Sequence, residues 1–174
     1  MILLNLSNNV IERFIMKIKQ SLSLIISCLF VGCASVPQAD SQLNQQAKQL
    51  IPPSNGNAAI YVYRSNSIVG AALKKDVWLD GKCLGETARG TFFYKEVLAG
   101  NHTLSTESEF SPNHLVVKAD SGKQYFVQQY IKPGVFVGGA NLKLIDDSQG
   151  RKAISEYQLA QGGNCSKPTV SVSQ

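Results

Sequence analysis

The chain has 174 residues, of which 44% are hydrophobic and only 17% are charged. This length suits one domain, and the hydrophobic share is sufficient for a folded core, which excludes a wholly disordered chain. The net charge of +5 is small and its charges are scattered, which argues against a nucleic-acid-binding protein. The four cysteines are too few for a fold built on disulfides.

The N-terminal segment is typical of a secretory signal. Lys17 and Lys19 precede an apolar stretch at 22–31 (LSLIISCLFV). A stable membrane span needs about 20 apolar residues, so this stretch is too short for one. Met16 directly precedes the basic pair, and we expect translation to start there. The alternative is that residues 1–31 form a genuine longer leader.

The apolar stretch ends at residues 30–33 (FVGC), which resemble the lipobox of bacterial lipoprotein precursors. In that motif a small residue precedes a cysteine whose thiol receives a diacylglyceryl group, and the signal is cut off just before it. The resemblance implies a signal peptide over 1–32 and acyl chains, such as palmitate, on Cys33. Cys28 lacks that setting and is the poorer candidate. The alternative is an ordinary signal cleaved nearby, for example after Ala34.

The same resemblance implies a location. Each buried methylene contributes about 0.8 kcal/mol and one acyl chain binds only marginally, so three chains would anchor the protein permanently. In Gram-negative lipoproteins, Asp after the lipidated cysteine favours the inner membrane, whereas this chain has Ala34. For a Gram-negative source we therefore expect a cell-envelope protein at the periplasmic face of the outer membrane, with the membrane as its partner through Cys33.

Residues 33–56 are polar and rich in Gln, and they end in the turn-forming sequence PPSNG. We expect a flexible tether here, which as coil would average roughly 26 Å from end to end. A short helix over 40–50, capped by Asp40 or Ser41, is compatible with the pattern.

Residues 57–160 have the alternating β-branched and aromatic pattern of a mainly β domain. Asp80-Gly81 and Ser121-Gly122 each predict a hairpin turn. Near 149–160 the period becomes helical. We therefore predict an antiparallel β-sandwich, or a small barrel, with a short C-terminal helix and a loose tail over 161–174. The predicted strands are 58–64, 76–80, 83–87, 91–97, 102–108, 114–120, 123–131 and 140–146.

Three parts of this β pattern occur together, namely residues 59–64 (AIYVYR), 77–85 (VWLDGKCLG) with 100–104 (GNHTL), and 122–128 (GKQYFVQ). Together they resemble the DUF2846 family, bacterial domains of unknown function that are often lipoproteins. The middle portion is also similar to PEGA-type modules, which are small surface β-domains. Neither resemblance supplies a catalytic residue; both imply a fold and an envelope setting.

The sequence contains no recognisable catalytic, metal or cofactor motif. His102 and His114 are its only histidines, whereas zinc needs three or four ligands. Asp146-Asp147 fits a helix N-terminus better than a cation site. We therefore expect no enzyme, no metal and no cofactor. An envelope enzyme is the third choice, and a cleft that joins His102 to a carboxylate and a hydroxyl would favour it.

Cys83 and Cys165 remain once Cys33 takes the lipid, and exported proteins live in oxidising surroundings. A disulfide between them is one expectation. Two separate thiols, or pairing with another chain, are the alternatives.

Adjacent aromatic residues such as Phe92-Phe93 must face opposite sides of a regular strand. One face therefore exposes aromatic rings unless the C-terminal helix or the second sheet covers it. We expect a non-catalytic domain that binds or scaffolds an unidentified envelope protein or ligand. The alternative is a module for a small apolar ligand or lipid, which an aromatic-lined pocket of roughly 300 Å³ or more would favour.

Overall fold

The computed structural model describes Arg13 and residues 32–167 of a chain that divides into two compact units, Met1–Gly32 and Cys33–Gln174. Apart from Arg13 and Gly32, the predicted signal segment lies outside the described residues, as does the tail beyond Lys167. None of the described helices is long and apolar enough to cross a membrane.

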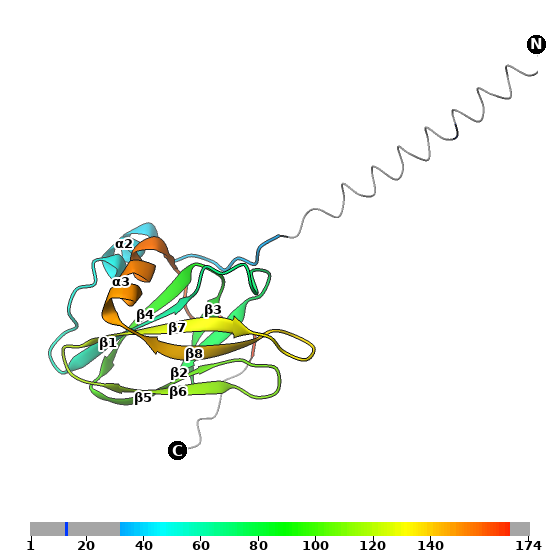
Figure 1. The fold of residues 1–174 in the computed structure, drawn as a ribbon. Coiled ribbons are helices and arrows are strands. Elements are labelled where there is room, and N and C mark those ends of the chain that lie inside the picture. Colours follow the sequence, from blue (N-terminus) through cyan, green and yellow to red (C-terminus); the bar gives the residue numbers. More distant parts are fainter. Residues whose placement is uncertain (1–12, 14–31, 168–174) are drawn as a thin grey trace, which may run out of the picture. The chain divides into compact units, whose positions relative to one another are not determined.

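The unit that begins at Cys33 contains two β-sheets packed face to face, with two helices on the outer face of the larger sheet (Figure 1). The larger sheet has the strand order β8-β7-β1-β4-β9, and the smaller one has β3-β2-β5-β6. The predicted sandwich is confirmed, and the alternative of a small barrel is wrong because the two sheets stay separate. The elements are α2 (Ser41–Lys48), β1 (Asn57–Arg64), β2 (Lys75–Leu79), β3 (Lys82–Thr87), β4 (Thr91–Leu98), β5 (Gly100–Thr106), β6 (Asn113–Ala119), β7 (Gln124–Lys132), β8 (Gly139–Ile145), α3 (Asp147–Glu156) and β9 (Gln158–Leu159).

The strands pair mainly in antiparallel fashion, but two pairs are parallel. β1 is antiparallel to β4 and parallel to β7, and β9 is parallel to β4. The hairpin predicted at Ser121-Gly122 is wrong, because β6 pairs with β5 in one sheet and β7 with β1 and β8 in the other. Gly122 does have the positive φ of 77° that its turn requires. A turn signal fixes local backbone geometry but not which strands pair.

The first predicted hairpin is confirmed. Leu79 pairs with Lys82 across Asp80 and Gly81, whose φ angles of 51° and 74° are both positive, as a two-residue turn requires. The C-terminal helix α3 is capped by Asp146, whose carboxylate accepts from the Gln149 backbone amide at 3.0 Å. The helix ends four residues earlier than the predicted 149–160, because the chain after it runs along β4 as β9.

The larger sheet is buried on both faces. Ile60 and Val62 of β1 lie between the sheets, while Tyr61 and Tyr63 lie beneath the helices. Phe92 and Phe93 are divided in the same way, with exposures of 0% and 5%. The aromatic face that the sequence left open is therefore covered by α2 and α3.

The expectation of a flexible tether over 33–56 is wrong, because much of this segment packs on the domain. Val36 is only 8% exposed and belongs to the core between the sheets. Gln38 forms a β-bridge with Ala160, and Ala47 of α2 is buried. The predicted helix exists, with Asp40 as its cap. A few well-placed apolar residues fix a segment whose average composition is polar.

The expectation of a loose tail is also wrong for residues 161–167. Cys165 is bonded to Cys83 of β3, with the two Cα atoms 6.1 Å apart. The Gly163 amide donates to the Leu84 carbonyl at 2.9 Å. The described end of the chain therefore lies along the smaller sheet, and the remainder of the predicted tail lies outside the described residues.

Candidate functional site

The two histidines do not form one site. His102 on β5 lies between two acceptors, with Nδ1 2.7 Å from Asp80 Oδ2 and Nε2 2.8 Å from the Leu98 carbonyl. Partial burial lowers the pKa of His102, but the hydrogen bonds to Asp80 and Leu98 and the charge of Asp80 outweigh it, and the pKa is raised. Because a carbonyl only accepts, both ring nitrogens carry protons when Asp80 is ionised.

The second histidine pairs with a hydroxyl. Ser105 Oγ lies 2.7 Å from His114 Nδ1, but Ser105 is completely buried. One histidine therefore has the carboxylate and the other has the hydroxyl, so the cleft that would favour an enzyme is not assembled from them. Within residues 32–167 no group of three or more His, Cys, Asp or Glu could hold a metal ion.

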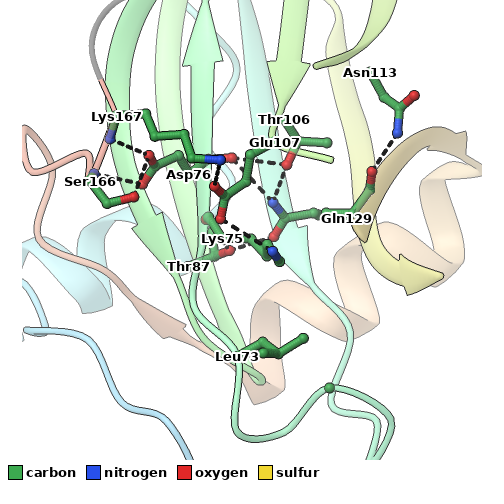
Figure 2. Close-up of polar contacts among 12 residues, drawn as sticks. Leu73, Lys75, Asp76, Thr87, Thr106, Glu107, Asn113, Gln129, Ser166 and Lys167 are labelled. Atoms are coloured by element: carbon green, nitrogen blue, oxygen red, sulfur yellow. Dashed lines mark hydrogen bonds and ion pairs between the residues drawn. The ribbon is translucent and has the colours of Figure 1, made fainter. Parts of the chain in front are cut away.

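A network of polar side chains fills the region between β2 and the C-terminal segment (Figure 2). Asp76 is completely buried, and its carboxylate accepts from the backbone amides of Ser166 and Lys167 at 3.0 and 2.9 Å. Glu107 forms ion pairs with Lys75 Nζ at 3.4 Å and with Lys167 Nζ at 3.0 Å. Backbone amides compensate the charge of Asp76, and lysines compensate that of Glu107. The network therefore fastens the C-terminal segment to the sheet.

The amide of Gln129 occupies the centre of the same network. Its nitrogen donates to Thr106 Oγ1 at 2.7 Å, and its oxygen accepts from the Thr87 hydroxyl. Gln129 is completely buried. A buried amide whose two ends are both bonded rigidifies a core and leaves no atom for a ligand.

Arg64, at the end of β1, is the one buried guanidinium of the described residues that lacks a carboxylate partner. It is 1% exposed, and burial lowers its pKa to about 10. Its donors reach the carbonyls of Gly70 at 2.8 Å and Leu73 at 3.3 Å. Arg64 therefore fixes the loop between β1 and β2 from beneath.

An apolar groove of about 460 Å³ lies beside α2, on the helix-covered face of the larger sheet. Leu43 and Ile51, each 55% exposed, form one side. The other lining side chains include the rings of Tyr61 and Tyr94 and the carboxylate of Glu96. The groove therefore offers a mainly apolar surface with a small number of polar atoms, as ligand sites do.

Glu96 and Tyr94, two polar residues of the groove, differ in charge. Glu96 accepts from Ser54 at 2.8 Å, Asn57 at 3.1 Å and the Tyr94 hydroxyl at 3.0 Å, and these hydrogen bonds lower its pKa. Burial, together with that bond to Glu96, raises the pKa of Tyr94 to about 12. The groove thus contains one fixed negative charge.

Tyr61 is the unpartnered member of the set. It is 1% exposed, its ring centre is 4.9 Å from that of Tyr94, and its hydroxyl bonds to no other described residue. Burial raises the pKa of Tyr61 well above its ordinary value, so the hydroxyl keeps its proton. Since Tyr61 lines the groove, its hydroxyl is free to donate to an acceptor atom of a ligand there, whereas the one fully buried and unbonded side-chain nitrogen or oxygen of the described residues is Trp78 Nε1.

The wall of the groove is held in place by hydrogen bonds from the middle of α2 and from the residues that follow it. Asn44 bonds Gln158 and Leu159, at 3.0 and 2.9 Å. After the helix, Gln124 Nε2 donates to the carbonyls of Leu50 and Ile51 at 2.9 and 3.0 Å. The groove is therefore a formed feature of the domain, although half of its wall comes from the segment expected to be a tether.

The sites predicted from the sequence lie elsewhere. Cys33 is exposed at the start of the unit, and Cys83 and Cys165 are bonded to each other on the smaller sheet. The sequence did not predict the groove, because Leu43 and Ile51 are isolated apolar residues in a polar segment. The tyrosines of β1 and β4 were its only signal.

Comparison with known proteins gives a family and one relative. The family described as "Protein of unknown function (DUF2846)" matches residues 54–140. A protein of Haemophilus influenzae, described as an uncharacterized protein, is 49% identical over 135 residues, which are 78% of this chain and 80% of the relative. No solved structure matches. The resemblance found in the sequence is confirmed: the chain belongs to the DUF2846 family.

Proposed function

We propose that this protein is a lipid-anchored component of the bacterial cell envelope whose domain binds a small apolar ligand, without catalysis, in the groove beside α2. The observation that carries the proposal is the aromatic-lined groove, whose lining includes Tyr61, a residue whose hydroxyl bonds to no other described residue. Its volume of about 460 Å³ exceeds the roughly 300 Å³ that small-molecule sites need. The groove therefore favours a ligand over a purely scaffolding role.

The chemistry of the lining defines the ligand class. Leu43, Ile51 and the ring of Tyr94 offer contacts to an apolar body. Tyr61 offers one hydrogen bond to an acceptor such as a carbonyl or ether oxygen. Glu96 remains ionised and repels an anion. We expect a neutral molecule with one acceptor, rather than a fatty acid or another carboxylate.

The anchor rests on the lipobox resemblance at residues 30–33 and on the exposure of Cys33 at the edge of the domain. Acyl chains on Cys33 would hold the protein at the membrane. For a Gram-negative source, we expect this to be the outer membrane. Replacing Cys33 by Ser should then release the protein from the membrane or leave an unprocessed precursor. An unmodified mature N-terminus in the intact mass of the wild type would contradict the anchor.

Ligand binding is tested with two fluorescent probes that differ in charge. Prodan is a neutral naphthyl ketone, whereas anilinonaphthalene sulfonate is an anion. The chain from Cys33 onwards, with Ser at position 33 so that no acyl chain competes, should bind prodan saturably and the sulfonate several-fold more weakly.

A pair of variants locates the binding. Leu43→Gln on the groove should weaken prodan binding several-fold. Leu98→Gln is the matched control, because Leu98 is 73% exposed and lies outside the groove lining. Absence of saturable binding, or an equal loss in the control, would contradict the proposed site.

A further inference from the structure

Six large apolar side chains are exposed on three loops of the domain. These loops join β1 to β2 (65–74), β5 to β6 (107–112) and β7 to β8 (133–138). Phe136 is 88% exposed and Ile68 is 84% exposed, so neither contributes to the core. The exposed apolar side chains are Ile68 and Val69, Phe110, and Val135, Phe136 and Val137. We call this set the apolar loop cluster.

The second and third loops are bonded to each other. The carboxylate of Glu109 accepts from three consecutive backbone amides, those of Val135 at 2.6 Å, Phe136, and Val137 at 3.3 Å. In Figure 1 both loops lie at the same end of the two sheets. Burial raises the pKa of Glu109, but the hydrogen bonds from these amides outweigh it, so the pKa is lowered. The negative charge next to Phe110 is thus compensated within the protein.

The first loop reaches the same place. A side chain at Gly70 would lie 2.5 Å from Ile131 Cγ1, and one at Gly138 would lie 3.0 Å from Leu73 Cδ1. The loop 65–74 therefore packs against the end of β7 and the last residue of the loop 133–138. All three loops meet at one end of the domain.

The predicted lipid attachment point lies at this same end. The Ala34 amide donates to the Ala71 carbonyl in the loop 65–74, at 2.9 Å. Cys33 directly precedes Ala34 in the chain, and consecutive Cα atoms are about 3.8 Å apart. Because Arg64 fixes this loop through the Gly70 and Leu73 carbonyls, the attachment point is fixed to the domain as well.

We propose that the apolar loop cluster docks on the lipid bilayer, with the tips of the three loops inserted among the headgroups next to the acyl chains of Cys33. This inference rests on the proposed anchor. An exposed group of large apolar side chains marks a surface that another phase covers. Acyl chains on Cys33 would leave the domain beside Ala71 and bring the membrane to this end of the domain, since no flexible segment separates Cys33 from the domain. Apolar side chains gain free energy at the boundary between headgroups and acyl chains.

The orientation is tested with a fluorophore at a single thiol. In the lipidated protein Cys33 is acylated and Cys83 is bonded to Cys165, so an added cysteine is the only reactive one. The variant Phe136→Cys places a nitrobenzoxadiazole label on the apolar loop cluster. Lys123→Cys is the matched control, because residue 123 precedes β7 and Phe136 follows it. Nine strand residues separate them by roughly 30 Å.

Both labelled proteins are reconstituted in vesicles of phosphatidylethanolamine and phosphatidylglycerol that contain a lipid-borne quencher. The label at 136 should show blue-shifted emission and several-fold stronger quenching than the label at 123. Equal, weak quenching at both positions would overturn the inference, and so would a blue shift at 136 without quenching, which indicates a protein partner or a second copy.

Flotation of the same vesicles separates this inference from the proposed anchor. A protein that floats but has an unquenched label at 136 contradicts the docking and leaves the anchor intact. A protein that does not float contradicts the anchor and the docking together. Melting curves of both labelled proteins, expected to match the wild type, show that the exposed substitutions leave the fold unchanged.

Discussion

Asp76 of β2 and Ser166 of the C-terminal segment form two hydrogen bonds, from the Ser166 amide at 3.0 Å and the Ser166 hydroxyl at 2.9 Å. Ninety residues separate them in the sequence. The carboxylate is completely buried, and the chain supplies the donors that compensate it. This pair explains why residues 161–167, which include few apolar side chains, pack on the domain.

Replacing Asp76 by Ala should therefore destabilise the domain. The change leaves the Ser166 and Lys167 amides without their acceptor, and each such loss costs about 1–3 kcal/mol. Urea unfolding measures the effect. Ser166→Ala removes only the hydroxyl bond and should cost less, about 1 kcal/mol. An Asp76→Ala variant as stable as the wild type would show that the contact is not energetically important.

The disulfide joins the same two regions. It closes a loop with a sequence separation of 82, for which the chain-entropy model gives about 4–5 kcal/mol as an upper value. Replacing Cys83 and Cys165 by Ser should lower the free energy of unfolding by a few kcal/mol. Hydrogen exchange should accelerate over residues 161–167 before it does in the sheets. Exchange that rises uniformly would contradict a local fastening role.

His102 predicts a pH-dependent stability with a definite sign. Its pKa is raised in the folded state, because its bonds to Asp80 and Leu98 outweigh burial. Its contribution is therefore fully present below about pH 6.5, the ordinary pKa of histidine, and is lost as the pH rises through the folded value.

Nuclear magnetic resonance titration of the imidazole measures this pKa directly. In the Asp80→Asn variant it should move back towards the ordinary value. A wild-type pKa below about 6.5 would contradict the geometry.

The sequence predicted most of the sheets because strand and turn signals are local. Asp80-Gly81 specifies its own hairpin, and the alternation of β1 specifies two buried faces. The parallel pairing of β1 with β7 was not predicted, because residues more than sixty positions apart meet there and no local signal records it. Val36 illustrates the same limit, since only the folded core shows that this residue is buried.

The groove was missed for a related reason. Its tyrosines were recognisable as strand residues, but its other wall consists of Leu43 and Ile51, which have meaning only once α2 is placed on the sheet. Asn57, at the start of β1, bonds Glu96 of the groove, whereas Arg64 at the end of β1 holds the loop beside Ala34. The proposed ligand site and the proposed membrane contact therefore use opposite ends of one strand.

Gly150 tests the contact that places α3 on the sheet. A side chain at this buried helical position would overlap the ring of Phe126. Gly150→Ala should therefore destabilise the domain by about 1–3 kcal/mol through overpacking, although Ala is the better helix former. Gln149→Ala, at the neighbouring exposed position of the same helix, is the control and should be close to neutral. A stabilised Gly150→Ala variant would mean that α3 packs differently.

Tyr61 gives the sharpest test of the groove. Tyr61→Phe removes the unpartnered hydroxyl and keeps the ring that contacts Tyr94 and Phe126. One hydrogen bond contributes about 0.5–1.5 kcal/mol, so prodan should bind roughly 2- to 12-fold more weakly. Phenylnaphthylamine is an apolar probe of similar shape without the ketone, and its affinity should not change.

The comparison between the two probes separates a hydrogen bond from a loss of shape. Tyr130→Phe, which removes a hydroxyl on β7 outside the groove lining, is the matched control and should bind both probes as the wild type does. If Tyr61→Phe weakens both probes equally, the hydroxyl acts through the structure of the groove rather than on the ligand. If it weakens neither, the ligand does not reach Tyr61, and the assignment of its hydroxyl as the polar contact of the site is wrong.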